Sequence, residues 1–439
     1  MNSMPNKSIA IIGGGFTGLT AALKLSELGY KVQVFEADDQ LGGLAGSFTV
    51  GGEQLEKFYH HWFTNDAYVT DLIRELGKEG NILYRPTETG SYYANKIFRL
   101  SSPLDLLKYT PISLYARLRM GLLVLIAKTV RNWQSLENIS AYDWIRKMAG
   151  NEVLEKVWQP LLIGKFGKFS EDVSAVWFWN KLVLRGGSRD SSGKEILAYY
   201  RGGFSALAEA IRQKVEENGG KIHLNTPIHG LTVYGNRATA VQSPTQSFEV
   251  DTVLCTTPLP IFAQIIEPHV TSEYLARLRR IKYLGNVCLT LELNRSLSKT
   301  YWLNISDPNF PFVGIIEHTN FEPKENYANR HIVYLSKYLP TDDPLYKMDK
   351  GQMFEYAIPH IKAMFPDFDS SWVLATHLYK AEHSQPIVEK NYSTLIPDHR
   401  TPVNNVYLAS MAQIYPEDRG TNYAIREGAK IAHFIGSQN

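Results

Sequence analysis

The sequence predicts an α/β fold in which a parallel sheet is assembled from separated parts of the chain. Its 439 residues exceed one typical core of about 100–200 residues, so we expect more than one domain. An apolar segment at 8–12 runs into a glycine-rich turn, and further strand-like segments lie at 221–224, 251–258 and 405–409. The composition, 44% hydrophobic and 21% charged, is that of a globular protein and excludes wholesale disorder.

Net charge and cysteine usage narrow the class of protein. The formal charge of +2, from 46 Lys and Arg against 44 Asp and Glu, provides no global field for nucleic acid, so we expect no nucleic-acid partner. Cys255 and Cys288 lie in apolar, β-branched runs, which predicts buried structural cysteines. So few cysteines suit a reducing compartment. Because residues 1–7 lack the apolar core of a secretory signal, we expect a cytoplasmic protein.

A glycine-rich turn follows the first predicted strand. The run GGGFTG at 13–18 lies between the apolar residues 8–12 and a helical pattern at 19–28. Gly13 permits a tight turn, Gly15 lets a pyrophosphate approach the backbone, and Gly18 allows close packing of helix on strand. The helix N-terminus supplies free N–H groups and a positive dipole. This order predicts a Rossmann-type dinucleotide-binding domain.

An acidic residue and a second glycine-rich segment follow. Residues 31–35 alternate as a second strand, and Glu36 comes 18 residues after Gly18, near the spacing of about 20 at which a carboxylate meets a ribose hydroxyl. The run ADDQLGGLAGS at 37–47 lets the backbone reach the phosphates again. The other glycine pairs lack this strand, turn and helix order, so the sequence predicts a single dinucleotide site.

In these segments the chain resembles FAD-binding proteins of the flavin monoamine oxidase, protoporphyrinogen oxidase and phytoene desaturase superfamily. The resemblance implies a Rossmann-type FAD-binding domain assembled from discontinuous segments, with a mixed α+β substrate domain that includes a helical block. It also implies that Ile228 touches the adenine through its backbone. The N-terminus of a last helix, running to about residue 435, would face the flavin. The cofactor-binding residues so implied are Gly13, Gly15, Phe16, Thr17, Gly18, Glu36, Ala37, Gly42, Gly43, Leu44, Ile228, Gly420, Thr421 and Asn422.

The chain departs from the superfamily after its last strand. Ser410-Met411 stands where the superfamily usually carries Gly-Asp or Gly-Glu, whose acid holds the ribityl chain. That contact is therefore not carried over. The polar and aromatic residues 413–419 replace it or line the substrate pocket, with Tyr415 as a candidate catalytic residue, or they form a loop with a surface pair of Asp418 and Arg419.

Five segments make up the predicted domain organisation. The FAD-binding domain takes residues 1–100, 199–258 and 403–439, a helical block that faces substrate or membrane takes 101–198, and the sheet part of the substrate domain takes 259–402. No second nucleotide module is available to reduce or reoxidise the flavin. Electrons therefore pass to oxygen, a quinone or another diffusible acceptor, or each cycle ends redox-neutral. The sequence carries no signal for an oligomeric state.

A histidine-containing cluster follows the phosphate loop. The run EKFYHHWFTND at 56–66 would lie near the isoalloxazine, and its end looks like the histidine segment of UDP-galactopyranose mutase, in which reduced FAD acts as a nucleophile. His60 or His61 is a candidate base or flavin contact, or else a satisfied core residue. Neighbouring histidines on a strand would point to opposite faces. We expect no metal, because no partner pair has ligand spacing.

One helical segment combines an apolar stretch with an excess of basic residues. Between Asp105 and Glu137 there is no acidic residue, while Lys108, Arg117, Arg119, Lys128 and Arg131 flank the apolar run 120–127. This pattern is typical of a helix on an anionic bilayer, here the inner face of the cell membrane. The alternative is a core helix whose basic ends reach water.

Three functions are compatible with these observations. The leading hypothesis is an FAD-dependent oxidoreductase that takes hydride from a C–N or C–C bond of an apolar or amphipathic small molecule onto flavin N5. The alternatives are a redox-neutral sugar-nucleotide mutase and a non-catalytic, FAD-binding, membrane-associated partner.

Overall fold

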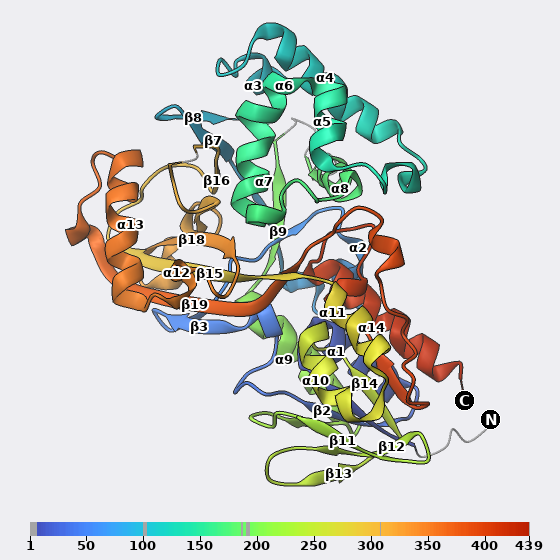
Figure 1. Cartoon of the computed structure of the whole chain (residues 1–439). Helices are drawn as coiled ribbons and strands as arrows, with labels where there is room; N and C mark the ends of the chain where they lie inside the picture. The colour runs from blue at the N-terminus through green and yellow to red at the C-terminus, as the bar shows by residue number, and fades with distance from the viewer. Residues whose placement is uncertain (1–6, 100–102, 186–187, 190–193, 308, 439) are drawn as a thin grey trace.

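A five-stranded parallel sheet organises the lower part of the molecule (Figure 1). The computed structural model describes residues 7–99, 103–185, 188–189, 194–307 and 309–438. The sheet order is β10-β2-β1-β14-β20, so strands from the start, middle and end of the chain pair side by side. The strands are β1 (Ser8–Ile12), β2 (Lys31–Phe35), β10 (Lys221–His223), β14 (Thr252–Cys255) and β20 (Val406–Leu408). The sequence prediction of a discontinuous α/β domain is confirmed.

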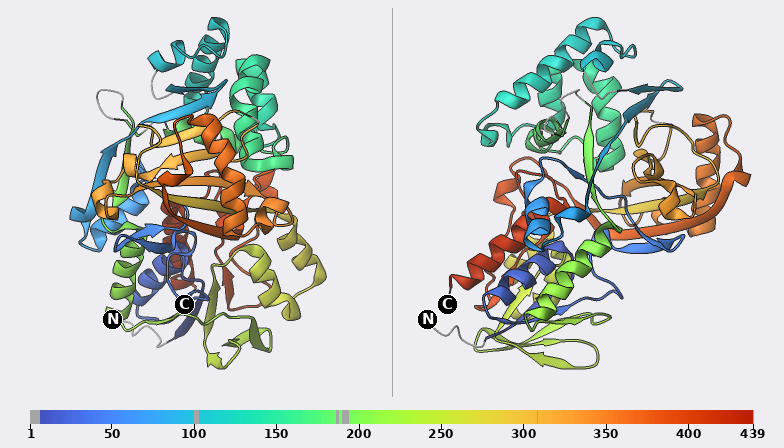
Figure 2. Two further views of the ribbon diagram at one scale, coloured as in Figure 1. Left: turned by 90° about the vertical axis from the view of Figure 1, so that its left-hand side faces the viewer. Right: turned by 180° about the vertical axis from the view of Figure 1, so that it is seen from behind.

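Helices cover one face of this sheet. Figure 2 shows them lying next to one another when the molecule is seen from behind: α1 (Phe16–Glu27), α9 (Gly203–Glu217) and α14 (Thr421–Gly436). Ile9 and Ile11 point into their core, whereas Ala10 and Ile12 point into a different core on the opposite face, as the two-residue period of a strand requires. Gly428 permits the close crossing of α1 and α14, since a Cβ there would lie 2.5 Å from the Thr17 carbonyl oxygen.

The opposite face of the parallel sheet is covered by a small antiparallel sheet and two helices (Figure 1). Cys255, on β14, faces this layer as a buried free cysteine, and Cys288 is buried and free on β15 (Tyr283–Leu293), so both match the structural role predicted for them. The covering elements are β11 (Gly230–Tyr234), β12 (Arg237–Gln242), β13 (Ser247–Glu249), α10 (Leu259–Ile266) and α11 (Ser272–Arg280).

A seven-stranded mixed sheet forms the second part of the molecule, in the order β19-β15-β18-β17-β16-β7-β8. Two of its strands, β7 and β8, come from the segment predicted as the first FAD-binding part, so the chain crosses between domains before residue 100. Helix α13 (Lys350–Met364) packs on this sheet. The strands are β7 (Thr89–Tyr93), β8 (Lys96–Arg99), β15 (Tyr283–Leu293), β16 (Trp302–Ile305), β17 (Gly314–Glu317), β18 (His331–Leu339) and β19 (Val373–Pro386).

Two short sheets connect these parts. One pairs β5 (Trp62–Phe63) and β6 (Ile82–Pro86) with β9 (Ile196–Tyr200). The other is the hairpin of β3 (Ser47–Val50) and β4 (Glu53–Glu56), which carries the chain away from the glycine-rich loops. Helix α2 (Ala67–Glu75) follows β5 and packs on α14.

A helical block lies at the end of the molecule remote from the parallel sheet (Figure 1). Within the described ranges, no helix is both long and apolar enough to cross a bilayer. A single turn of π-helix, Leu154–Trp158, separates α6 from α7. The helices of the block are α3 (Pro103–Leu107), α4 (Leu114–Thr129), α5 (Ala141–Ala149), α6 (Asn151–Val153), α7 (Gln159–Phe166) and α8 (Ala175–Arg185).

Candidate functional site

The first glycine loop is held in place by its neighbours on both sides. The Gly13 N–H donates to the Phe35 carbonyl at 2.8 Å, and the Thr256 hydroxyl donates to the carbonyls of Ile12 and Gly13 at 3.0 and 3.1 Å. A Cβ on Gly18 would lie 2.0 Å from the Gly13 carbonyl oxygen. The turn can therefore close only with glycine at 18, the position at which the sequence predicts close packing of helix on strand.

The second glycine loop returns against the first. The Gly42 N–H donates to the Gly14 carbonyl at 2.9 Å, and the φ values of Gly42 and Gly43, +110° and +58°, are strained for other residues. At Gly15 an added Cβ meets nothing closer than the Gly43 Cα at 4.0 Å. The two loops thus form a backbone cradle that is open at Gly15.

Glu36 lies at the end of β2, beside this cradle. One carboxylate oxygen accepts the Gly14 N–H at 2.7 Å and the other accepts the Asp38 N–H at 2.9 Å. Burial raises the pKa of Glu36, and these two hydrogen bonds oppose that rise. Each oxygen keeps a second lone pair with which it can accept from a ribose hydroxyl.

The C-terminal helix begins in the same region. Gly420 precedes α14 with extended backbone, and a Cβ at Gly420 would meet nothing within 4 Å. The Asn422 side chain accepts the Val69 N–H at 3.1 Å and so satisfies a donor at the start of α2. The Asn422 side chain is thus engaged by α2, and it is the backbone of α14's first turn that can face a ligand. Ile228, in the connection from β10 to β11, is buried at 7% exposure.

His60 and His61 lie in the coil before β5, and not on a strand as the sequence suggests. The His60 Nδ1 lies 2.5 Å from the Phe58 carbonyl oxygen. Because a carbonyl only accepts, Nδ1 carries the proton and the Nε2 lone pair is left. Burial, assisted by the nearby positive charge of Arg419, lowers the pKa of His60 to about 4. His60 is therefore neutral at physiological pH.

His61 faces a different set of neighbours. Its Nδ1 lies 2.8 Å from the Tyr301 hydroxyl, and its ring packs edge-on against Trp302 and Phe321. His60 instead packs on Phe204. The two histidines thus contact different aromatic side chains, but they do not lie on opposite faces of a strand as the sequence analysis expects.

Arg419 connects the C-terminal loop to the seven-stranded sheet. Its guanidinium donates to the Tyr338 hydroxyl at 2.7 Å and to the Gln385 side-chain oxygen at 3.2 Å. The neighbouring Asp418 is only 4% exposed, so the predicted alternative of a surface Asp418–Arg419 pair is wrong. Lys165 and Lys181 pair with Asp418 at 3.1 and 2.7 Å. Burial opposes ionisation of Asp418, but these cations outweigh it and hold its pKa well below the usual range.

Comparison with known proteins decides the family. A model of flavin-containing amine oxidoreductases matches residues 16–432. The chain belongs to the flavin-containing amine oxidoreductase family. Zeta-carotene desaturase of Arabidopsis thaliana is 22% identical over 461 aligned positions, which cover 92% of this chain and 81% of the relative.

Solved structures show the same fold. A protein of Exiguobacterium sp. 255-15 that was classed as a protoporphyrinogen oxidase has a TM-score of 0.80 at 15% identity, with 100% of both chains covered. Reduced UDP-galactopyranose mutase has a TM-score of 0.76 at 15% identity, with 99% of this chain and 96% of that chain covered. The superfamily resemblance is confirmed, and this member of the amine oxidoreductase family is a flavin-dependent oxidoreductase.

In this amine oxidoreductase, Tyr415 lies apart from the two histidines. Its hydroxyl donates to the Glu137 carboxylate at 3.0 Å, and its ring packs on Trp133 and Tyr392. It thereby joins the C-terminal loop to the helical block. Its catalytic role stays a prediction.

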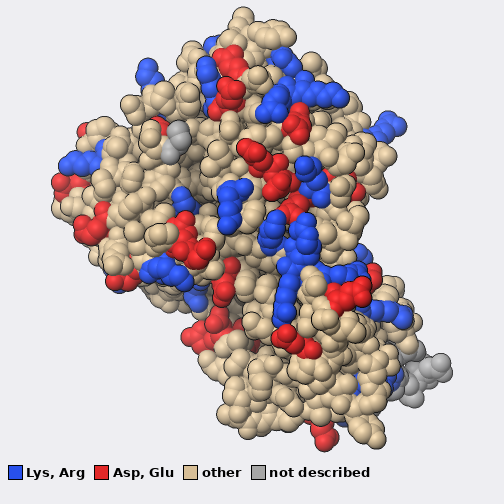
Figure 3. All heavy atoms as spheres, in the orientation of Figure 1, with Lys and Arg blue, Asp and Glu red and all other residues tan. Residues whose placement is uncertain are grey.

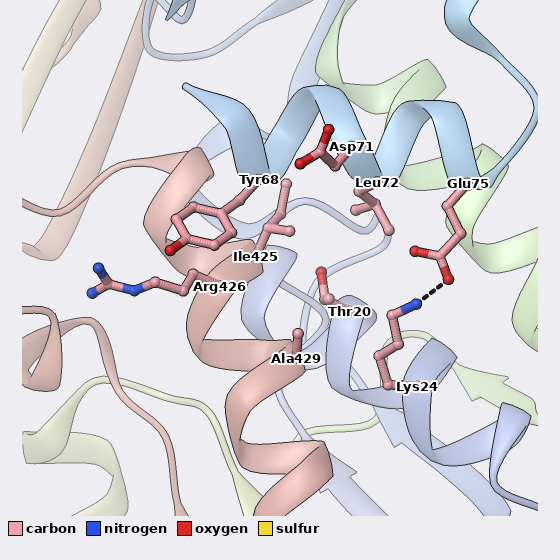
Figure 4. A pocket seen from close by; sticks show the side chains of 9 residues that line it. All are labelled: Thr20, Lys24, Tyr68, Asp71, Leu72, Glu75, Ile425, Arg426 and Ala429. Atoms are coloured by element: carbon pink, nitrogen blue, oxygen red, sulfur yellow. Dashed lines mark hydrogen bonds and ion pairs between the residues drawn. The ribbon is translucent and has the colours of Figure 1, made fainter. Parts of the chain in front are cut away.

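Two hollows lie in the part of the oxidoreductase that the structure describes. A small one is lined by His61, Phe63 and Trp302, among others. The second, of about 150 Å³, lies between α1, α2 and α14 (Figure 4). An ion pair of Lys24 and Glu75 borders it, and none of the predicted site residues lines it.

Sequence reasoning missed Lys165, Lys181 and Tyr338. The nearest cation to Asp418 in the sequence is Arg419, whereas Lys165 is 253 positions away. Only the excess of polar residues at 413–419 pointed to a buried site in this part of the chain.

Proposed function

We propose that the protein binds FAD and transfers hydride from a C–N or C–C bond of an apolar or amphipathic substrate to it, with reoxidation by oxygen or another diffusible acceptor. The backbone cradle at Gly15 carries this proposal. The cradle lies beside Glu36, whose carboxylate can accept from a ribose hydroxyl. Helix α14, the last helix of the same domain, begins in this region. The named desaturase relatives favour a C–C bond.

Different residues of this chain would bind the cofactor and act on the substrate. FAD, when bound, supplies the hydride acceptor. The amides of the glycine loops would hold its pyrophosphate, Glu36 would accept from the ribose, and the first turn of α14 would place its positive dipole toward the flavin ring. His60, neutral and desolvated, can accept a hydrogen bond or a proton at Nε2. The Phe204 ring, which packs on His60, helps to exclude water from it.

The test of the cofactor site is Gly15→Asp. Because a Cβ added at Gly15 would meet no protein atom closer than 4.0 Å, we expect this variant to fold. Its carboxylate would occupy the cradle and repel a pyrophosphate. We expect wild-type protein to be yellow, and the variant to keep its circular dichroism spectrum but lose bound FAD. A variant that folds and retains full FAD occupancy would show that the phosphates bind elsewhere.

Kinetics separate the oxidoreductase from the mutase alternative. Hydride transfer consumes one acceptor for each turnover and starts from oxidised flavin. A mutase needs flavin that is reduced beforehand and consumes no acceptor. Turnover of the second kind would refute the proposed reaction while leaving the FAD site intact.

We also propose that one face of the helical block contacts the membrane surface. The outward face of α3 and α4 exposes seven large apolar side chains, between 45% and 70% exposed. They are Leu104, Leu107, Leu114, Tyr115, Leu118, Leu122 and Leu125. A core helix would bury this face, and α4 already buries its other face through Ala116, Met120, Leu123 and Ala127. An exposed apolar row of this size favours contact with a bilayer surface.

The basic residues near this face have two different roles. Arg117 donates to the carbonyls of Leu107 and Ile112, and Arg119 donates to the carbonyl of Met148, so both brace the block. Three other cations, Lys108, Lys128 and Arg131, are exposed and available to anionic headgroups.

Vesicle binding tests the membrane proposal. We expect wild-type protein to co-sediment with vesicles of phosphatidylglycerol and phosphatidylcholine, and Leu118→Gln with Leu122→Gln to abolish most of this. Leu374→Gln is the matched control, because Leu374 is 54% exposed on another element. Equal binding by all three proteins would refute the role of α4.

A further inference from the structure

The hollow between α1, α2 and α14 has no part in the proposed reaction (Figure 4). Its volume is about 150 Å³, and all three helices contribute side chains to its lining. None of the lining residues belongs to the glycine loops or to the histidine-containing cluster at 56–66. The hollow is therefore a place at which the protein can hold a second kind of molecule.

The inner wall of the hollow is apolar. Leu72 and Ile425 are each 3% exposed, and both belong to the core that the three helices enclose. Ala429, one turn after Ile425 on α14, adds only a methyl group to this wall. An apolar surface of this kind favours a ligand with an apolar body.

Thr20 places one polar group in the wall. It is 0% exposed and lies within α1, and Figure 4 shows its hydroxyl pointing away from α1 toward α2. A threonine inside a helix commonly bonds to the carbonyl four residues earlier. Among the described residues, however, the Thr20 Oγ1 has no hydrogen-bond partner. Because a buried hydroxyl without a partner is unfavourable, a ligand that brings one hydrogen-bonding group would be stabilised here.

The charges at the rim of the hollow are already paired within the protein. Lys24 pairs with Glu75 across the hollow's edge, and Arg426 pairs with Glu417 and Glu427 at 2.8 and 2.9 Å. The other acid of the rim, on α2, pairs with an arginine of the same helix. Figure 3 shows basic and acidic side chains next to one another over the region where Figure 1 places α14. A charged ligand would compete with these pairs, whereas a neutral ligand would leave them in place.

The size of the hollow sets the size of the ligand. A space of about 150 Å³ accepts a molecule about as large as benzene. The Tyr68 ring lies at the rim, and the Arg426 guanidinium lies over it, 5.9 Å from its centre. This contact helps to fix the tyrosine ring, against whose edge or face another ring can pack.

We propose that the hollow binds a small neutral molecule with one six-membered ring and one hydroxyl group, a phenol or a cyclic alcohol. The ligand hydroxyl bonds to the Thr20 hydroxyl, and Leu72 and Ile425 pack on the ring. A hydroxyl group both donates and accepts, so either orientation of the Thr20 hydroxyl suits it. The site goes beyond the proposed function and does not depend on it, because the cradle at Gly15 contributes nothing to the lining.

Fluorine NMR titration of the full-length protein, in the flavin state in which it is purified, tests the site. The probes are 4-fluorophenol and 4-fluorotoluene, which have the same ring but a hydroxyl or a methyl group. We expect wild type to bind 4-fluorophenol saturably with a Kd of about 1 mM or below. Thr20→Val keeps the shape of the side chain and should raise this Kd about tenfold, while the Kd for 4-fluorotoluene stays within about twofold. Ala429→Leu fills the hollow from α14 and should abolish binding of both probes.

Thr70→Val is the matched control for Thr20→Val. Thr70 is a buried threonine of α2 outside the lining, and its hydroxyl donates to the Asp66 carbonyl at 3.2 Å. The control should therefore keep the wild-type Kd for 4-fluorophenol. Thr20→Val should also keep or raise the wild-type Tm, because it removes a buried hydroxyl that has no partner.

Three results would overturn the proposal. Absence of saturable binding of 4-fluorophenol by wild type would mean that the hollow holds water only. An equal Kd for 4-fluorophenol in wild type and Thr20→Val, or equal weakening by Thr70→Val, would place the probe elsewhere. A Thr20→Val protein that unfolds, or whose Tm falls below that of wild type, would show that the protein itself satisfies the hydroxyl.

Discussion

Glu56 is a buried carboxyl group whose ionisation should be visible in the stability of the protein. It is 1% exposed, and its oxygens accept from the Tyr199 hydroxyl at 3.0 and 2.8 Å and from the Phe204 N–H at 2.7 Å. Among the described residues no Lys or Arg forms an ion pair with it. Burial therefore dominates and raises the pKa of Glu56 to about 7.

The raised pKa of Glu56 determines the sign and the size of the pH dependence of stability. Folded protein holds a proton on Glu56 between pH 4.5 and about 7, whereas the unfolded chain has released it, so stability falls as pH rises through this window. Each pH unit in this window lowers the free energy of unfolding by ~1.4 kcal/mol, so about 3 kcal/mol is lost by pH 8. Glu56→Gln removes the ionisable group and should remove this loss.

The measurement is the difference between the two proteins, from urea unfolding at pH 5, 6, 7 and 8. Taking the difference matters because burial lowers the pKa of His60 to about 4 and that of His318 to about 3. These groups make stability rise with pH, and their contribution is common to both proteins. The variant should gain about 3 kcal/mol on wild type from pH 5 to 8, which corresponds to about 3 °C in Tm for a chain of this length. A difference that does not change with pH would refute the reasoning.

Three other expectations concern single residues. Gly18→Ala should prevent flavin incorporation because its Cβ has no room, while Gly80→Ala, in open space, should keep the wild-type ratio of flavin to protein. The buried imidazole of His60 resists protonation, so wild type should lose about 3 kcal/mol of unfolding free energy relative to His60→Gln as pH falls from 6.5 to 4. Urea unfolding at both pH values measures this difference, and equal acid sensitivity of the two proteins would contradict the burial of His60. Tyr415→Phe should cost about 1–2 kcal/mol of stability through the lost bond to Glu137; unchanged thermal stability with lost turnover would instead favour catalysis.

The nucleotide-binding half could be predicted because its determinants are local. The turn at Gly13, the packing at Gly18 and the position of Glu36 each depend on spacing within 30 residues. The lack of acidic residues around α4 could also be seen in the sequence, but the contacts of its basic side chains could not. Sequence alone could not show that Arg117 and Arg119 bond to backbone carbonyls, because the partners of Arg119 lie 28 and 29 positions away on α5.

The cluster of charged residues around Asp418 could not be predicted because long-range contacts define it. Asp418 and Arg419 have the sequence of a surface pair, and they are buried only because α7, α8 and β19 close over them. In the same way, the partner of Tyr415 is 278 positions away. Such contacts follow from the packing of whole domains, and no short pattern encodes them.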